Sequence, residues 1–227
     1  MEHLFTALRL LFIPTLSLSF WLSAGRWDLP FAWAYWGMWI GWCMTALVAL
    51  VVSKNFRALA KERSRPGLGS IEKNIPVLIV LSIIVLVSHW AVAGLDVGRF
   101  HWSDTVPFGL RILGLLCILL GMSCNTWAGL HNPFASSVIR LQDDRGHHVI
   151  TSGPYQFVRH PGYAGGVLIL VCGGLALGSW LAMLPLLIFF PMVIARTKRE
   201  DEFLNKNLDG YITYASQVQY RLLPGVW

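Results

Sequence analysis

The sequence predicts an all-α integral membrane protein with about six transmembrane helices, and three observations support this fold class. Hydrophobic residues make up 55% of the chain and charged residues only 13%. With a mean hydropathy of +0.56, the chain is too apolar for an ordinary soluble domain. Apolar runs of about 20 residues, long enough to cross the hydrocarbon core of a bilayer, recur along it. The basic residues gather in alternate loops, as they do in helical membrane proteins.

The apolar runs define the expected helices in order. Single spans are expected at 4–22, 30–53, 75–95 and 106–130. Because Arg9 interrupts the first run and no good small-residue cleavage site follows it, we interpret 4–22 as a retained helix rather than a signal peptide. The stretch 161–195 lacks any charge and is nearly twice as long as one span. Gly178 and Ser179 lie at its middle, so we expect a hairpin of two short antiparallel helices with a tight turn there.

The loop charges predict the topology. Most of the 18 Lys and Arg residues lie at the N-terminus or within 54–74, 131–160 and 196–227. These segments, and therefore both termini, are expected on the cytoplasmic side. Arg111 falls inside the fourth span, where it must snorkel or face the bundle interior. The net charge of +6 then reflects this asymmetry and an attraction to anionic lipid head groups, and no nucleic-acid partner is expected.

Polar groups that could carry chemistry concentrate after residue 130. We expect residues 1–130 to form a transmembrane scaffold of four helices with the basic inner loop 54–74. Residues 131–227 comprise a polar loop, the helical hairpin and a polar tail. Because the hairpin returns the chain to the membrane face from which it started, the two polar segments can meet in one pocket at the cytoplasmic interface.

Two pairs of residues stand out near the ends of the hairpin. Arg159 and His160 directly precede the apolar run, and charge so close to hydrocarbon is usually retained for chemistry; Pro161 suits a first helical position. Arg196 and Glu200 are spaced i, i+4 and share one helix face. They could form an ion pair at a helix end, or Arg196 could clamp an anionic substrate group while Glu200 holds a cation. The residues alone leave both readings open.

The histidines do not predict a metal site. His131, His147, His148 and His160 show neither the mutual spacing nor the accompanying carboxylate of a zinc or di-iron site. We therefore expect no bound metal and assign these side chains to hydrogen bonding with a ligand or the backbone.

One combination of residues resembles a known family. It reads His147-x-Val149-Ile150-Thr151-x-Gly153-Pro154-Tyr155-x-x-Val158-Arg159-His160-Pro161-x-Tyr163-x-Gly165, then the charge-free hairpin, then Arg196-x-x-x-Glu200-Asp201-x-x-Leu204 and Tyr211-x-x-Tyr214. This pattern, covering roughly 131–227, resembles the isoprenylcysteine carboxyl methyltransferase family, which belongs with the phospholipid methyltransferases and uses S-adenosylmethionine. The usual Glu-Glu pair of that family reads Glu200-Asp201 here, which preserves the charge.

The resemblance implies a role for each matching residue. The S-adenosylmethionine site would be lined by His147, Val149, Gly153, Tyr155, His160, Pro161, Tyr163 and Glu200. The methyl acceptor would be bound by Arg196, Arg159 and Asn132, and Arg196 and Glu200 would be the catalytic pair. The acceptor would be a lipophilic small molecule or a lipid, such as a prenylcysteine-like carboxylate or a phospholipid amine, and membrane lipids would be the remaining partners.

Two other functions are compatible with parts of the pattern. Sterol-type reductases that use NADPH resemble this family in their C-terminal helices and also carry an Arg/His-Pro-x-Tyr-x-Gly element, but they would need a larger bundle of about ten helices. A non-catalytic scaffold or small transporter that keeps the fold is the other alternative, and a transporter should place paired charges near mid-bilayer.

Overall fold

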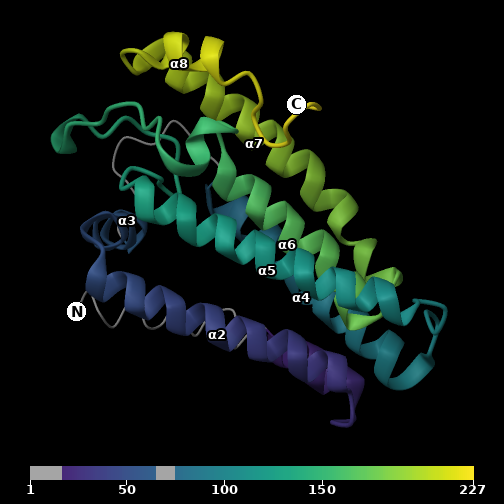
Figure 1. Cartoon of the computed structure of the whole chain (residues 1–227). Coiled ribbons are helices and arrows are strands. Elements are labelled where there is room, and N and C mark those ends of the chain that lie inside the picture. The colour runs from purple at the N-terminus through teal and green to yellow at the C-terminus, as the bar shows by residue number, and fades with distance from the viewer. Residues whose placement is uncertain (1–16, 65–74) are drawn as a thin grey trace.

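The computed structural model describes residues 17–64 and 75–227 (Figure 1). Within these ranges the protein is helical and has no strand, which confirms the predicted all-α class. The main helices are α2 (Pro30–Val52), α3 (Lys54–Ser64), α4 (Ile75–Leu95), α5 (Phe108–His131), α6 (Pro161–Leu177), α7 (Leu186–Asn207) and α8 (Tyr211–Gln217). A π-helix (Asp96–Phe100) continues α4, and short 3-10 segments occur at Asp143–Arg145, Gly153–Gln156 and Leu181–Met183.

Four helical stretches are long and apolar enough to cross a membrane. They are Pro30–Val52, Val77–Phe100, Phe108–His131 and Leu181–Asn207. At most 28% of the apolar window of each is buried inside the protein, and side chains such as Val51 and Leu187 are 75% and 65% exposed. Apolar surface on this scale is suited to lipid rather than water, so the structure is that of an integral membrane protein.

The predicted spans agree with these helices in three cases. The spans 30–53, 75–95 and 106–130 correspond to α2, α4 and α5, with ends that differ by a few residues. Most of the predicted span 4–22 lies outside the described residues, although residues 17–24 are helical. Since α6 has only 17 residues, the described part of the chain supports four candidate spans, and the count of six stays a prediction.

The hairpin turns where the sequence predicted. The N–H of Gly178, which has a φ of 88°, donates to the carbonyl oxygens of Gly174 and Leu175 and ends α6, a common helix stop because glycine adopts this left-handed conformation easily. The expectation that both helices are short is wrong for the second. Helix α7 has 22 residues and continues to Asn207, because no glycine or proline lies between Ala195 and Gly210 to stop it earlier.

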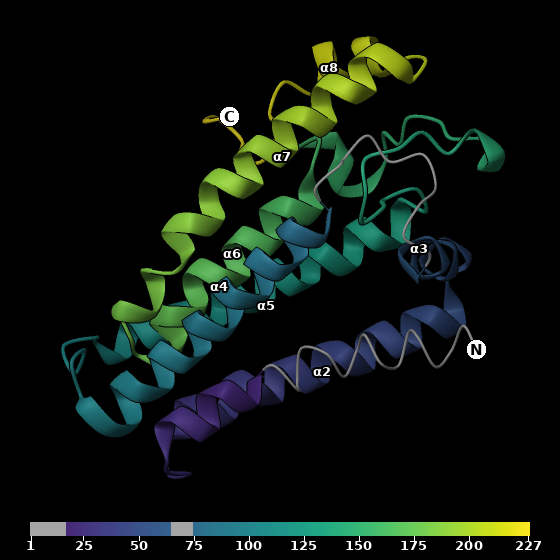
Figure 2. The same cartoon turned by 180° about the vertical axis from the view of Figure 1, so that it is seen from behind.

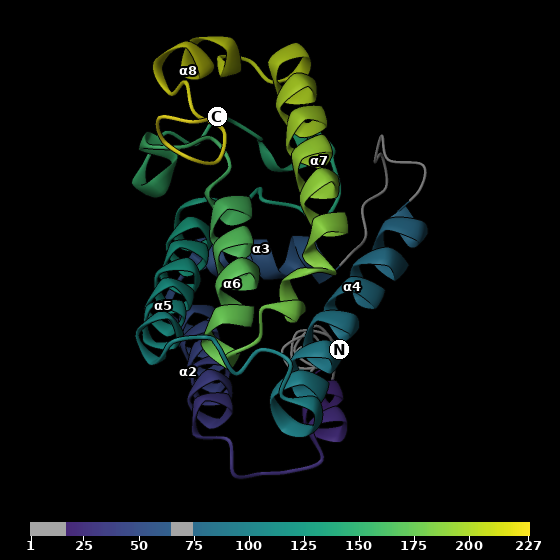
Figure 3. The same ribbon diagram turned by 90° about the vertical axis from the view of Figure 1, so that its right-hand side faces the viewer.

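Close packing of α5 on α6 forms the centre of the bundle, and Figure 3 shows the two helices side by side. A Cβ atom placed on Gly121 would lie 2.8 Å from the carbonyl oxygen of Gly165, and one on Gly165 would lie 2.7 Å from that of Gly121. Glycine at both positions lets the two backbones approach closely, as is common between membrane helices. The aromatic side chains Trp90, Tyr35 and Phe20 are buried nearby in the main apolar cluster.

Buried hydrogen bonds hold the bundle together at the hairpin turn. The carboxylate of Asp96, which is fully buried, accepts hydrogen bonds from the hydroxyls of Ser103 and Ser179, both at 2.5 Å. The guanidinium of Arg111 lies over the ring of Phe31 at 5.4 Å and against Gly178. Arg111 is therefore accommodated at this end of its helix, beside the turn.

The polar segments lie together at the other end. In Figures 1 and 2, α3, the loop that follows α5, and α8 gather at the end of the bundle away from the Gly178 turn. This end contains the candidate site.

Candidate functional site

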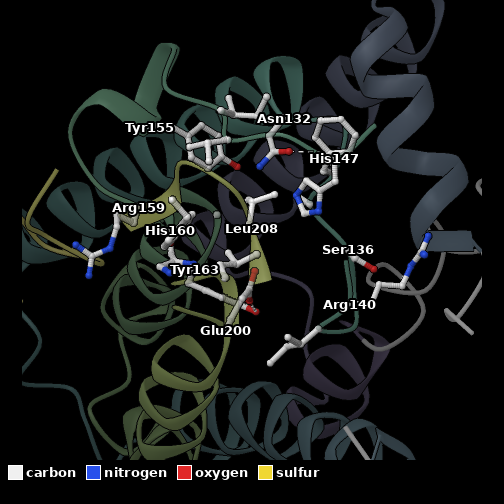
Figure 4. A pocket seen from close by; sticks show the side chains of 18 of the residues that line it. Asn132, Ser136, Arg140, His147, Tyr155, Arg159, His160, Tyr163, Glu200 and Leu208 are labelled. Carbon is white, nitrogen blue, oxygen red and sulfur yellow. Dashed lines mark hydrogen bonds between the residues drawn. The ribbon is translucent and has the colours of Figure 1, made fainter. Parts of the chain in front are cut away.

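A cavity of about 310 Å³ lies among α3, the end of α5, the loop that follows it, the start of α6, α7 and α8. Figure 4 shows Glu200, Tyr163 and His160 on one side of it, with His147 and Asn132 across from them. Many of the residues expected in the site contribute to its wall. These are Asn132, His147, Val149, Tyr155, Arg159, His160, Tyr163 and Glu200.

Two further expected residues, Gly153 and Pro161, shape the wall from behind. Gly153 has a φ of +62°, and a Cβ there would lie 2.7 Å from the ring of His131, so only glycine suits the position. It begins the 3-10 segment that carries Tyr155. Pro161 is the first residue of α6 and is buried. Its fixed φ is suited to a helix start, and Tyr163 lies in the first turn of the helix that begins there.

Tyr163 connects the two members of the expected catalytic pair. Its hydroxyl donates to Oε2 of Glu200 at 2.7 Å and accepts from Nε of Arg196 at 2.7 Å. Nη2 of Arg196 also donates to the carbonyl oxygen of Ser137 at 2.7 Å. Arg196 is not part of the cavity wall, so in this structure it supports Tyr163 and the loop, whereas Glu200 faces the cavity.

Asp201 lies next to Glu200 in sequence but has a different environment. It is 1% exposed and accepts hydrogen bonds from Arg159 (Nε 2.7 Å and Nη2 2.9 Å), from Nε of Arg221 at 2.9 Å and from the hydroxyl of Tyr211 at 3.0 Å. Nε2 of His160 lies 3.3 Å away. The two adjacent carboxylates therefore differ: Glu200 is presented to the cavity, and Asp201 connects the segments around it.

Arg159, expected to bind substrate, is held by these protein contacts. Besides its paired bonds to Asp201, Nη1 donates to the carbonyl oxygens of Val218 and Gln219 at 2.7 and 2.9 Å. Its side chain is only 6% exposed. A guanidinium engaged in this way builds the wall of the cavity and connects it to the C-terminal segment.

The C-terminal segment supports the cavity wall through contacts that sequence reasoning, which expected only that the polar tail meets the polar loop, did not identify. The backbone N–H groups of Arg159 and His160 donate to the carbonyl oxygens of Tyr220 and Arg221, both at 2.9 Å. The guanidinium of Arg221 lies 5.1 Å from the ring of Trp227. The sequence marked the polar tail as a whole, but no local spacing could indicate these particular pairings.

Tyrosines close the side of the cavity next to α8. Tyr155, Tyr211 and Tyr214 are each less than 10% exposed, and the hydroxyl of Tyr214 donates to the carbonyl oxygen of Tyr155 at 2.7 Å. Burial raises the pKa of Tyr155 to about 12 and raises that of Tyr214 as well. These phenols are therefore neutral at physiological pH and present polarisable rings and hydroxyls rather than charge.

His147 carries a buried polar atom in the cavity wall. Its ring packs on Phe134 with 4.7 Å between centroids, and burial, followed by the neighbouring His148, lowers its pKa to about 4. The imidazole is therefore neutral at physiological pH. Nδ1 is buried and has no hydrogen-bond partner among the described residues, and buried polar atoms normally have one. A ligand in the cavity could supply it.

The loop that carries His147 is attached to α3. The carboxylate of Glu62 accepts hydrogen bonds from Arg140 at 2.8 and 2.7 Å, from Ser136 at 3.0 Å and from Arg145 at 3.3 Å. Arg63, the next residue of α3, lines the cavity. Sequence reasoning missed this cluster because Glu62 lies more than 70 residues before its partners and shares no local spacing with them.

These features define the class of protein: a helical membrane protein with a carboxylate and several aromatic rings lining a pocket at one end of its bundle. Residues 110–209 match the family model described as phospholipid methyltransferase. The matched model is a domain of the isoprenylcysteine carboxyl methyltransferase-like group of membrane methyltransferases, and the match spans less than half of the chain. No curated protein matches the chain. The matched segment contains α6, α7 and the loop between α5 and α6, but not α3 or α8.

Proposed function

We propose that the cavity binds S-adenosylmethionine and that the protein transfers its methyl group to a lipophilic acceptor. The observation that carries the proposal is the carboxylate of Glu200, the one acidic side chain that the described residues contribute to a cavity wall with tyrosine, phenylalanine and histidine rings, within the segment that matches a methyltransferase model. A carboxylate together with aromatic faces is the chemistry that recognises a soft organic cation, and S-adenosylmethionine is such a cation.

The residues present fit this cofactor. Glu200 would hold the amino group, and the rings of Tyr155 and Tyr163 would face the positive sulfur. Nδ1 of His147, which has no protein partner among the described residues, would bond to a polar atom of the cofactor. When bound, S-adenosylmethionine supplies an electrophilic methyl group that is ready for an in-line displacement.

The protein would then align the acceptor with the methyl group and exclude water from the cavity. The hydrogen bond from Tyr163 fixes the orientation of the Glu200 carboxylate, and the buried tyrosines keep bulk water from that side. A carboxylate acceptor would need no general base. An amine or alcohol acceptor would need one within hydrogen-bond reach, and Glu200 and His160 are the candidates in the wall.

Several features support an acceptor that partitions into the membrane. The cavity lies at one end of helices whose apolar side chains are exposed over much of their length, and its own wall includes Val138, Ile139 and Leu204. A cavity at the interface can receive a water-soluble cofactor from one side and a lipid-dissolved acceptor from the other. The methyltransferase domain favours this function over an NADPH-dependent reductase, and the buried polar cavity favours it over a scaffold without chemistry.

Calorimetric titration of S-adenosylmethionine, and separately of NADPH, into the detergent-purified protein tests the proposal. We expect binding of S-adenosylmethionine to the wild type and a loss of about tenfold or more in affinity for Glu200→Gln, because the variant removes a charge-assisted contact. Glu202→Gln is the matched control, since that side chain lies two positions away and is 53% exposed. Binding of NADPH alone, or equal affinities in the wild type and Glu200→Gln, would contradict the proposal.

A further inference from the structure

Glu62 differs from the other charged residues of α3. Other charged side chains of the helix, such as Lys54 and Lys61, are exposed, whereas the Glu62 side chain is 5% exposed. Among the described residues, its hydrogen-bond donors Ser136, Arg140 and Arg145 belong to the loop between α5 and α6. A buried carboxylate on a helix whose other charges are exposed indicates a specific role, because burying a charge is costly unless it is paired.

We propose that Glu62 is a positioning residue for the cavity: it holds the loop 134–149 in the conformation that places His147 and Val149 in the cavity wall. The identity of the bound molecule rests on the proposed function, but the positioning itself does not. Residues expected to be scaffold thereby complete the site.

The loop depends on this contact because it has little regular structure of its own. Its single 3-10 turn, Asp143–Arg145, is the only helical segment between α5 and residue 152. Two of its internal hydrogen bonds run through Arg145, which donates to the side chain of Gln142 and to the carbonyl oxygen of Pro133. Gln142 is fully buried and donates in turn to the carbonyl oxygen of Phe134 at 2.6 Å. Fixing Arg145 therefore fixes the start of the loop and its turn near Gln142.

A continuous set of contacts leads from Glu62 to the cavity. Nη1 of Arg145 lies 3.3 Å from Oε2 of Glu62, and its guanidinium lies 5.6 Å from the centre of the Phe134 ring. Phe134 packs directly on His147. Movement of Arg145 would consequently be transmitted to the imidazole through one aromatic ring.

Helix α3 provides a fixed support for these contacts. Nδ2 of Asn55 donates to the carbonyl oxygen of Leu130 at 3.0 Å. A Cβ placed on Gly129 would lie 3.0 Å from the side chains of both Phe56 and Leu59, so α3 packs closely on the end of α5. The position of Glu62 is thus set by the bundle rather than by the loop.

Charge balance explains why the carboxylate is needed. Arg140 and Arg145 are only 14% and 25% exposed, and Glu62 separates their charges. Burial tends to raise the pKa of Glu62, but hydrogen bonds from Arg140 and Ser136 outweigh it and lower the pKa, so the group is ionised at neutral pH. Without it, two poorly solvated guanidinium groups would repel each other, and the loop would open to hydrate them.

Hydrogen exchange and cofactor binding together test the proposal with Glu62→Gln. In the variant without any cofactor, we expect faster amide exchange across 134–149, with α5 and α6 unchanged. We expect S-adenosylmethionine to bind about tenfold more weakly, within the range of coupling between connected sites. Asp144→Asn is the matched control, because Asp144 also lies near Arg140, at 3.5 Å, but is 66% exposed; it should match the wild type in both measurements.

Two further variants keep the test decisive. The exchange of charges in Glu62→Arg with Arg140→Glu should restore part of the protection of 134–149, which a general loss of stability would not do. If Glu62→Gln does not fold, Glu62→Asp, which keeps the charge but shortens its reach, should show the local change alone. Exchange in Glu62→Gln identical to the wild type, or faster throughout the bundle, would overturn the proposal. Failure of the wild type to bind S-adenosylmethionine would contradict the proposed function only, since exchange is measured without it.

Discussion

Glu200 and Asp201 are adjacent carboxylates whose burial and hydrogen-bond partners differ. Glu200 faces the cavity and has Tyr163 as a donor, whereas Asp201 is 1% exposed and surrounded by Arg159, Arg221 and Tyr211. The shorter side chain at position 201 is suited to this task, since it keeps the charge close to the α7 backbone where all three donors meet. Glu200 is therefore the carboxylate that a ligand in the cavity can reach, whereas Asp201 has an architectural role.

Asp201→Asn should therefore reduce stability. The amide has nearly the same shape, but it leaves the buried guanidinium of Arg159 without its counter-charge, and removing one partner of a buried ion pair costs about 3 to 5 kcal/mol. We expect the free energy of unfolding in detergent, measured by chemical denaturation, to fall by about 3 kcal/mol. Glu202→Gln, on the exposed side of the same helix turn, should change it by less than about 0.5 kcal/mol. Equal stabilities of the two variants would contradict the architectural role of Asp201.

At the scale of single helices, local hydropathy and turn chemistry made most of the fold predictable. The spans 30–53, 75–95 and 106–130 and the turn at Gly178 could be read from the sequence because apolar length and glycine act locally. The length of α7 was underestimated because the apolar run 161–195 defined the bounds of the expected hairpin, and the helical segment expected at Arg196 and Glu200 was not joined to its second helix. A helix can continue beyond its apolar part when no residue there stops it. Because α7 does so, Glu200 and Asp201 lie on a helix rather than on a loop.

The contact between α5 and α6 offers a test at this scale. In Gly165→Ala the new methyl group would lie 2.7 Å from the carbonyl oxygen of Gly121, so the helices must separate. Overpacking of this kind costs about 1 to 3 kcal/mol. Gly166→Ala is the matched control, because a Cβ there meets nothing within 4 Å and alanine favours the helix. Thermal unfolding in detergent should show a lower midpoint for Gly165→Ala only; a similar decrease for both variants would show that the close approach is unimportant.

At the scale of the whole molecule, the cavity draws residues from both sides of the segment that matches the methyltransferase family. In the cavity wall, Arg63 precedes that segment and Tyr211 follows it. Behind the wall, the buried carboxylates of Glu62 and Asp201 each pair with two arginines, one of which, Arg140 or Arg159, lines the cavity. The sequence pattern could indicate many wall residues because they form one compact motif, but it could not indicate these pairings, which depend on how distant segments meet in the fold.

The side of the membrane on which the cavity lies determines whether it can meet its cofactor. The distribution of Lys and Arg predicts that the cavity end is cytoplasmic, where S-adenosylmethionine would be available. Single cysteines at Lys206→Cys, on the cavity end of α7, and at Trp102→Cys, which is 56% exposed near the hairpin turn, test this in a background that lacks the four native cysteines. A membrane-impermeant maleimide should label Trp102→Cys in intact cells and Lys206→Cys only after permeabilisation. The reverse pattern would place the cavity outside the cell, away from any cytoplasmic cofactor, and would require a different ligand for the same carboxylate and rings.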